Sequence, residues 1–299
     1  MKAAATAPSR LARLADVWYD YRQSPVAVIA LAIVVILLVA AAFAPLISPQ
    51  DPYNQATLDL FDARLEPGSV GGGGYTHLLG TDGMGRDLFS AILYGLRVSF
   101  TVGVAAGAVA LVLGATVGLV AAYYGGRIEA LIMRTIDLQL SMPAILLALV
   151  LVAVLGQGMI QLIVALVAAQ YAYFARTTHG AASAERRKDY IEAALSTPLP
   201  ARRVLFKHLL PNALPPLIVV ATVQVASAIS LEATLSFLGL GLPMTQPSLG
   251  SLISNGFTYL LSGRYWISIY PGLVLMLLVV SINLVGDQVR HVLNPRRGR

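Results

Sequence analysis

The stretch VSFTVGVAAGAVALVLGATVGLVAAYY, residues 98–124, contains no charged side chain over its whole length. An α-helix rises about 1.5 Å per residue, so this stretch would extend roughly 40 Å as a helix. That length exceeds the ~30 Å hydrocarbon core of a bilayer, inside which the backbone must satisfy its own hydrogen bonds. Residues 98–124 therefore predict a transmembrane helix, with lipid rather than water as the solvent around it.

Four glycines in this stretch, Gly103, Gly107, Gly114 and Gly118, follow one another at offsets of 4, 11 and 15 residues from the first. At about 100° per residue, all four lie on one face of a helix. Small residues four apart let a second helix approach closely within a membrane. Glycine is also simply common in membrane helices, but four on one face favour a packing seam.

The composition of the whole chain agrees with a membrane protein. Of its 299 residues, 57% are hydrophobic and 12% are charged, whereas soluble chains carry about 25% charged residues. The absence of cysteine from the sequence excludes disulfides, thiolate metal sites and thiol nucleophiles. The net charge of +6 fits cytoplasmic loops rich in Lys and Arg, an interpretation we prefer to nucleic-acid binding.

Other apolar segments raise the predicted number of spans to six. Residues 138–175 carry no charge and are too long for one crossing, so a turn at Gly156-Gln157-Gly158 predicts a hairpin. The first span is an uncleaved anchor rather than a signal peptide, because a polar lead of about 25 residues precedes it. The predicted spans are 26–47, 98–124, 130–155, 159–177, 212–235 and 265–286.

The basic residues predict the orientation in the membrane. With both termini in the cytoplasm, 17 of the 21 Lys and Arg residues lie inside, and Arg64, Arg86, Arg97 and Arg264 lie outside. Cytoplasmic loops collect Lys and Arg, and an even number of spans agrees with this orientation. The predicted segments are a cytoplasmic stretch 1–25, the first span, an outer loop 48–96, a core 97–290 with a cytoplasmic loop 178–211, and a basic tail 291–299.

The cytoplasmic loop 178–211 is long and has the pattern of two helices. Residues 186–194 contain good helix formers and no breaker, which predicts a helix. Thr197-Pro198-Leu199-Pro200 ends it, and Pro200 suits the first turn of a second helix, where its missing N–H costs nothing. A helix, a sharp turn and a helix predict a rigid lever that projects from the membrane.

The residues of this loop resemble those of a known family. Glu192-Ala193-Ala194, with Leu210-Pro211 at the family's spacing, resembles the EAA loop of permease subunits in bacterial ABC importers. Over residues 20–297 the chain is similar to the C-type permease of the dipeptide, oligopeptide and nickel importer group. The further matching segments are HLLGTDGMGRDL (77–88), EATLSFLGLG (232–241), Pro271-Gly272, NLVGDQVR (283–290) and 293–296. One departure is Pro198, which stands where the family pattern has glycine.

The resemblance implies an all-α polytopic fold, the type I ABC importer permease fold, in which the EAA loop docks on an ATP-hydrolysing subunit. The implied partners are a second homologous permease, two cytoplasmic ATPases that bind ATP and Mg, and an extracytoplasmic binding protein that delivers the solute. The implied location is the bacterial inner membrane, and the expected solute is a di- or oligopeptide. Nickel chelates, glutathione and opine-like compounds stay open as alternatives. The residues expected to dock on the ATPase are Asp189, Tyr190, Glu192, Ala193, Ala194, Pro198 and Pro200.

The outer-loop motif 77–88 predicts a compact turn before the second span. Its glycines with Asp82, Arg86 and Asp87 allow the arginine to pair with a carboxylate and the carboxylates to cap backbone N–H groups. We expect these three residues to order the start of the span. A direct contact with the delivery protein is a second interpretation of the same motif.

Three acidic residues lie in or at the ends of spans, where an ionisable group marks a functional candidate. Arg134 with Asp137, and Asp287 with Arg290, are three residues apart and predict local ion pairs. Glu232 has no such local cation. Together with the four glycines of residues 98–124, it is the candidate for the translocation pathway or for the interface with the second permease.

The sequence does not support an enzyme. None of the three lysines follows a glycine, so the phosphate-binding pattern G-x-x-x-x-G-K-[ST] is missing, and the four histidines lack the spacing H-E-x-x-H. We therefore expect no catalytic residue, bound cofactor or metal in this chain. The other hypothesis is a self-sufficient secondary transporter, which often has more spans and internal repeats.

Overall fold

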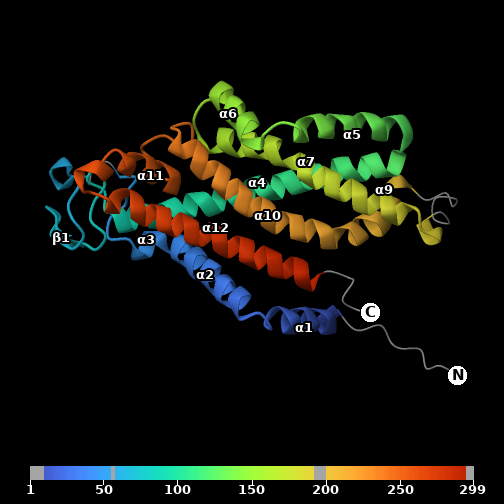
Figure 1. Cartoon of the computed structure of the whole chain (residues 1–299), viewed down its shortest axis with the longest axis horizontal. Coiled ribbons are helices and arrows are strands. Elements are labelled where there is room, and N and C mark those ends of the chain that lie inside the picture. Colours follow the sequence, from blue (N-terminus) through green and yellow to red (C-terminus); the bar gives the residue numbers. More distant parts are fainter. Residues whose placement is uncertain (1–9, 55–57, 192–199, 294–299) are drawn as a thin grey trace.

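The computed structural model describes residues 10–54, 58–191 and 200–293. Its long helices run side by side along one axis, with a two-stranded hairpin at one end (Figure 1). The strands β1 (Ser69–Val70) and β2 (Thr76–His77) pair antiparallel, with Ser69 opposite His77. The helices are α1 (Arg10–Tyr21), α2 (Pro25–Ala42), α3 (Ala44–Ile47), η2 (Leu60–Asp62), α4 (Leu88–Tyr124), α5 (Gly126–Leu140), α6 (Ala144–Leu155), α7 (Met159–Arg186), α9 (Ala201–Arg203), η3 (Val204–Leu209), α10 (Leu210–Phe237), α11 (Leu249–Phe257), η4 (Leu260–Ser262) and α12 (Trp266–Val292).

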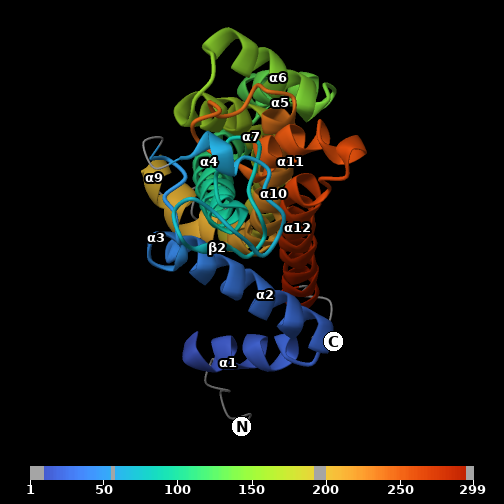
Figure 2. The same cartoon turned by 90° about the vertical axis from the view of Figure 1, so that its left-hand side faces the viewer.

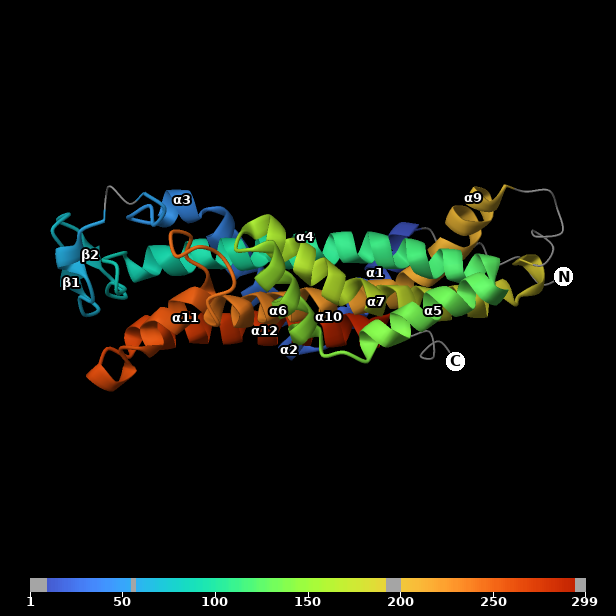
Figure 3. The same cartoon turned by 90° about the horizontal axis from the view of Figure 1, so that it is seen from above.

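The helices form a bundle in which α4, α7 and α10 are central. Seen from the hairpin end, α5 and α6 lie on one side of these three helices, and α1 and α2 lie on the opposite side (Figure 2). Viewed from above, β1, β2 and α11 gather at one end, whereas α5 and α9 lie toward the other (Figure 3). Gln288 of α12 donates to the carbonyl oxygens of Asp20 and Tyr21, so α1 and the last turns of α12 meet.

Within the described ranges, five helices are long and apolar enough to cross a membrane, namely α2, α4, α7, α12 and the continuous stretch Ala201–Phe237. The pair α5 and α6 makes a sixth span if it is counted as one, which agrees with the predicted six. This pair is bent by 89° between Leu140 and Ala144. The single helix predicted for 130–155 is therefore wrong. Pro143 lacks an N–H and disfavours helix in the residue before it.

Two helices extend beyond the spans predicted for them. The helix α4 begins at Leu88, ten residues before the predicted span at 98–124, so its first turns fall within the predicted outer loop 48–96. The helix α7 extends to Arg186, nine residues beyond the predicted end of the span at 177. The helix predicted for 186–194 is interrupted, because residues 187 and 188 form a turn before helical residues 189–191, and residues 192–194 lie outside the described part.

The four glycines of α4 pack against helices of the same chain. A Cβ at Gly103 would come within 2.7 Å of Ile229, and one at Gly107 within 3.1 Å of Val225, both in α10. Gly114 and Gly118 face the backbone of α7 between 171 and 179. The glycines therefore serve close packing within this chain. Their predicted role at a pathway or at the interface with a second permease stays a prediction, and the contacts seen here are with α7 and α10 of the same chain.

We expect Gly114→Ala to destabilise the bundle, because the added methyl would overlap the Tyr171 carbonyl oxygen and lie 2.5 Å from the Cβ of Phe174. Overpacking of this kind typically costs about 1–3 kcal/mol. Gly107→Ala is the matched control, since its methyl would meet only a movable side-chain carbon of Val225 at 3.1 Å. A thermal melt of the purified protein compares them, and an equal Tm for the two variants would contradict this packing.

Candidate functional site

The start of the cytoplasmic loop is anchored by a buried isoleucine. Ile191 has 0% exposure and packs in an apolar cluster with Leu119 of α4, Ala182 of α7, and Val204 and Leu209 of η3. The loop is therefore joined by apolar packing to α4, to α7 and to η3, which continues directly into α10.

Polar contacts reinforce the same junction. The Tyr190 hydroxyl hydrogen-bonds to the Glu185 carboxylate, and the Asn212 amide donates to the Tyr190 hydroxyl at 3.2 Å. Lys188 pairs with Glu185 at 2.7 Å. Desolvation, followed by the bond to Glu185, raises the pKa of Tyr190 to about 12, so its hydroxyl stays protonated near neutral pH. The loop before 192 is thus linked to the first turn of α10 by a hydrogen-bond chain.

The residues predicted to dock on an ATPase fall on both sides of a gap in the description. Asp189 and Tyr190 are exposed beside the buried Ile191. Pro200 is also exposed and directly precedes α9, with φ −65° and ψ 138°. Glu192, Ala193, Ala194 and Pro198 lie outside the described residues. The described part therefore shows where the docking segment is attached but not the segment itself.

A partly polar cleft of about 870 Å³ lies between α5, α7, α10 and the end of α12. Pro215 and Pro216 lie on its α10 wall and cannot donate backbone hydrogen bonds, so the carbonyls of 211 and 212 lose their usual helical partners. Such carbonyls are tolerated at membrane depth only when buried in protein or facing water. Its polar lining residues are Tyr173, Arg176, Thr177, Asn212, Gln224 and Arg290.

The charged residues near this cleft pair differently from the prediction. Asp137 forms its ion pair with Arg176 of α7, not with Arg134 three residues earlier. Among the described residues, Asp287 has no ion pair within 4.0 Å, so its predicted bridge to Arg290 is also wrong. Helix packing brings Asp137 and Arg176 together across 39 positions of sequence, a proximity that local spacing does not reveal. Arg290 instead faces the cleft.

Glu232 is enclosed within the chain. Its exposure is 0%, it accepts hydrogen bonds from Ser99 at 3.1 Å and Ser236 at 2.8 Å, and Ser248 at the start of α11 lies close to it. The carboxylate therefore joins α4, α10 and the N-terminus of α11. Its predicted role at the pathway or at a permease interface stays a prediction, and the structure adds that these three elements of the same chain cover the side chain. Ser236, four residues later in the sequence, is the local partner that a search for cations missed.

We expect Glu232→Ala to destabilise the half of the bundle nearer the β1–β2 hairpin. The change would remove the acceptor of two buried serine hydroxyls, those of Ser99 and Ser236, and each buried polar group left without a partner costs about 1–3 kcal/mol. Glu232→Gln keeps an acceptor oxygen and the side-chain shape, so its loss should be smaller. The exposed Glu66 is the control, since Glu66→Ala should change stability by less than about 0.5 kcal/mol. A Tm for Glu232→Ala equal to that control would refute this role.

At the hairpin end, Asp82 and Arg86 form a buried ion pair. Arg86 Nε lies 2.7 Å from Asp82 Oδ2, and Arg86 Nη1 donates to the Met244 carbonyl at 3.1 Å. The other Asp82 oxygen accepts from the backbone N–H groups of Met84 and Arg86. The pair therefore closes the turn 82–86 and connects it to the segment before α11.

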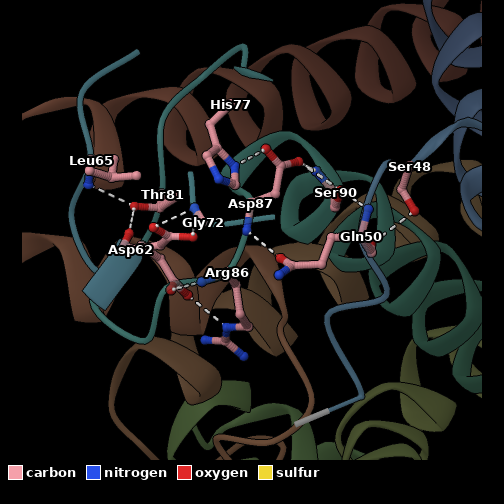
Figure 4. A network of polar contacts seen from close by, with 11 residues as sticks. Ser48, Gln50, Asp62, Leu65, Gly72, His77, Thr81, Arg86, Asp87 and Ser90 are labelled. Atoms are coloured by element: carbon pink, nitrogen blue, oxygen red, sulfur yellow. Dashed lines mark hydrogen bonds and ion pairs between the residues drawn. The ribbon is translucent and has the colours of Figure 1, made fainter. Parts of the chain in front are cut away.

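Asp87 caps the start of α4. Its carboxylate accepts from the Ser90 N–H at 2.8 Å and the Ser90 hydroxyl at 2.7 Å, and its other oxygen lies 3.0 Å from His77 Nδ1. Gln50 accepts from the Asp87 N–H at 2.7 Å, which fixes the chain that follows α3 (Figure 4). His77, Gln50 and Ser90 were missing from the predicted site, although the Asp87-x-x-Ser90 spacing is a capping signal.

Known proteins resemble the chain in both sequence and fold. Residues 114–299 match the family described as "Binding-protein-dependent transport system inner membrane component", and residues 13–67 match the "N-terminal TM domain of oligopeptide transport permease C". A putative peptide transport system permease protein of Brucella suis is 38% identical over 268 residues, which cover 90% of this chain and 87% of that protein. A di/tripeptide transport system permease protein of Pseudomonas aeruginosa is 35% identical over 284 residues, 95% and 92% of the two chains.

A solved structure shows the same fold. A chain of the inward-facing MetNI methionine ABC transporter superposes with a TM-score of 0.55 at 21% sequence identity. The match covers 68% of this chain and 96% of that chain. The all-helical membrane bundle is therefore an architecture found in ABC importers.

Proposed function

The chain belongs to the family of binding-protein-dependent transport system inner membrane components, and from this premise we propose that it forms half of an ATP-driven import pathway for di- or oligopeptides. The chain itself does no bond chemistry. Its role is mechanical, because a movement imposed on the cytoplasmic loop is passed to the spans that line the pathway.

The observation that carries this proposal is the burial of Ile191. The side chain connects the loop to α4, α7 and η3, and η3 continues directly into α10. An ATPase that docks on Asp189, Tyr190, Glu192, Ala193, Ala194, Pro198 and Pro200 would therefore act on several spans at once. Closure of the ATPase subunits supplies the work, and the apolar cluster around Ile191 transmits it.

We place the solute path along the cleft between α5, α7, α10 and α12. Lipid does not solvate its arginines or its proline-freed carbonyls, so this side of the chain must be covered by protein or by water. A second homologous permease that covers this side would enclose the cleft as an aqueous passage between the two subunits. The 89° bend between α5 and α6 lies beside it and gives the passage a place to change width.

The orientation, the partner subunits and the solute are proposed from the family and from the distribution of Lys and Arg along the chain. The chain crosses the inner membrane with both termini in the cytoplasm, where most of its Lys and Arg residues then lie. Two ATPase subunits bind ATP and Mg, and an extracytoplasmic binding protein delivers the solute to the end that carries the Asp82–Arg86 turn. Peptides are the preferred solute because the relatives from Brucella suis and Pseudomonas aeruginosa are named for peptide transport.

The docking role is tested by moving one charge within the loop. Glu192→Ala combined with Ala194→Glu keeps the net charge and composition while changing the face on which the carboxylate lies. We expect the variant permease to assemble with its partner permease but to lose the ATPase subunits in a pull-down and to lose ATP-coupled uptake. Normal assembly and normal uptake would refute docking at these residues.

The solute class is tested by competition. Uptake of a labelled dipeptide should be inhibited by unlabelled di- and tripeptides and unaffected by nickel chelates or an opine. Glutathione is itself a tripeptide with an unusual γ-linkage. Inhibition of dipeptide uptake by glutathione, compared with inhibition by ordinary tripeptides, distinguishes a general peptide carrier from a dedicated glutathione system. Inhibition by a nickel chelate or an opine alone would replace the peptide proposal.

A further inference from the structure

A second groove, of about 700 Å³, lies between α2, α4, α10 and α12. It differs in kind from the polar cleft, because every side chain that lines it is apolar except those of Thr116 and Thr222. Both hydroxyls bond to carbonyls of their own helices, at 2.7 and 2.8 Å, and so need no further partner. The helix α10 thus separates a hydrated side from a side that lipid can cover.

The length of the groove suits a lipid acyl chain. Along α4 it is lined from Phe100 to Leu119, which corresponds to roughly 28 Å of helix at about 1.5 Å per residue. The hydrocarbon core is ~30 Å thick and each leaflet contributes about half of it, so an acyl chain that enters from one leaflet would occupy about half of the groove. Val34 and Leu38 of α2 line it together with Phe100, and Phe206 and Leu210 line it together with Leu119.

The groove leads to a basic mouth. Phe206 also lines an adjoining hollow, whose other residues include Arg202, Arg203 and Lys207. Within the described ranges, none of these three cations has an ion-pair partner within 4.0 Å. The mouth is also formed in part by η3, a π-helical turn, a feature that is frequent at functional sites. Positive charge without a described counter-ion, at the end of an apolar groove, suits a ligand with an anionic head and an apolar tail.

We propose that this groove and its basic mouth bind one anionic phospholipid of the cytoplasmic leaflet. Its acyl chain lies between α4 and α10 beneath α2, and its phosphate lies against Arg203 and Lys207, which are four residues apart. Basic pockets at the cytoplasmic ends of membrane helices bind such headgroups by charge and hydrogen bonding. The leaflet assignment rests on the proposed orientation, whereas the groove and its mouth do not. The bound lipid would brace the junction through which the loop moves α10.

The headgroup site is tested by native mass spectrometry of the assembled transporter titrated with phosphatidylglycerol or with phosphatidylcholine. Each basic residue near an anionic lipid is worth about a factor of five, so Arg203→Gln with Lys207→Gln should weaken phosphatidylglycerol binding roughly 30-fold. Arg127→Gln with Arg134→Gln removes two exposed charges from α5, far from the groove, and should leave binding unchanged. Equal weakening by both pairs, or equal binding of the two lipids by the wild type, would overturn the proposal.

The tail site has its own pair of variants. Val112 is 65% exposed and lines the groove, whereas its neighbour Leu113, 47% exposed, does not. Val112→Trp should therefore abolish lipid retention, and Leu113→Trp should preserve it. A photo-crosslinker at position 112 should capture lipid. Capture of the partner permease there, or unchanged retention in Val112→Trp, would overturn the proposal, while dipeptide uptake by the wild type reports separately on the transport function.

Discussion

Replacing Arg86 by alanine is expected to lower the free energy of unfolding by about 3–5 kcal/mol, because it leaves the Asp82 carboxylate buried without its cation. Both side chains are only 2% exposed, and the bond between Arg86 Nε and Asp82 Oδ2 is 2.7 Å long. The loss also frees the Met244 carbonyl and loosens the turn that precedes α4. Denaturation of the purified full-length protein measures the effect.

A double-mutant cycle separates the ion pair from general disruption. Asp82→Asn keeps acceptors for the N–H groups of Met84 and Arg86 while removing the charge. Combined with Arg86→Met, it should cost less than the sum of the two single changes, because no unpaired buried charge remains. Arg64→Ala, an exposed arginine above Tyr259 at the same end, should cost no more than about 1 kcal/mol. Additive costs in the cycle would show that the two charges do not interact.

Replacing Ile191, the buried residue that anchors the cytoplasmic loop, by aspartate is expected to uncouple transport from ATP hydrolysis. In Ile191→Asp the side chain cannot stay ionised in the apolar cluster with Leu119 and Val204, so the loop detaches at a cost of several kcal/mol. Since about 1.4 kcal/mol is a factor of ten, the anchored population and ATP-coupled uptake should fall by more than tenfold. Uptake by the reconstituted complex is the measurement, with ATPase activity recorded beside it.

The control for this variant lies near the end of α7. Ala184→Asp adds the same charge at an exposed position of that helix and should leave uptake nearly unchanged. We expect Ile191→Asp to retain ATP hydrolysis by the docked subunits while it loses uptake, which is the signature of a broken transmission. Uptake equal to that of Ala184→Asp would mean that the cluster around Ile191 carries no movement.

The sequence predicted the spans well because hydrophobicity over about 20 residues is a local property. Boundaries were less accurate where a helix continues past the apolar run. The helix α4 passes through Arg97 because its N-terminus is fixed ten residues earlier, where Asp87 accepts hydrogen bonds from Ser90. The bend between α5 and α6 was concealed by an uninterrupted apolar composition, although Pro143 marked its position.

Within the site, contacts between residues close in sequence could be predicted, whereas contacts between distant residues could not. The turn 82–86 could be anticipated because its charges are close in sequence and only a few geometries join them. The hydroxyl groups around Glu232 come from Ser99, Ser236 and Ser248, and the pairing of Asp137 with Arg176 depends on how α5 packs on α7. Such contacts depend on how the helices pack against one another. The sequence of a single helix does not determine that packing. The polar cleft was missed for the same reason.

Reconstitution of the full complex in vesicles tests the central claim most directly. The chain, its partner permease, the two ATPase subunits and the binding protein are assembled, and labelled dipeptide uptake is followed with each component or ATP withheld in turn. We expect uptake only when ATP, both ATPases and the binding protein are present. Robust uptake by the permease pair alone, driven by a proton or sodium gradient, would contradict it.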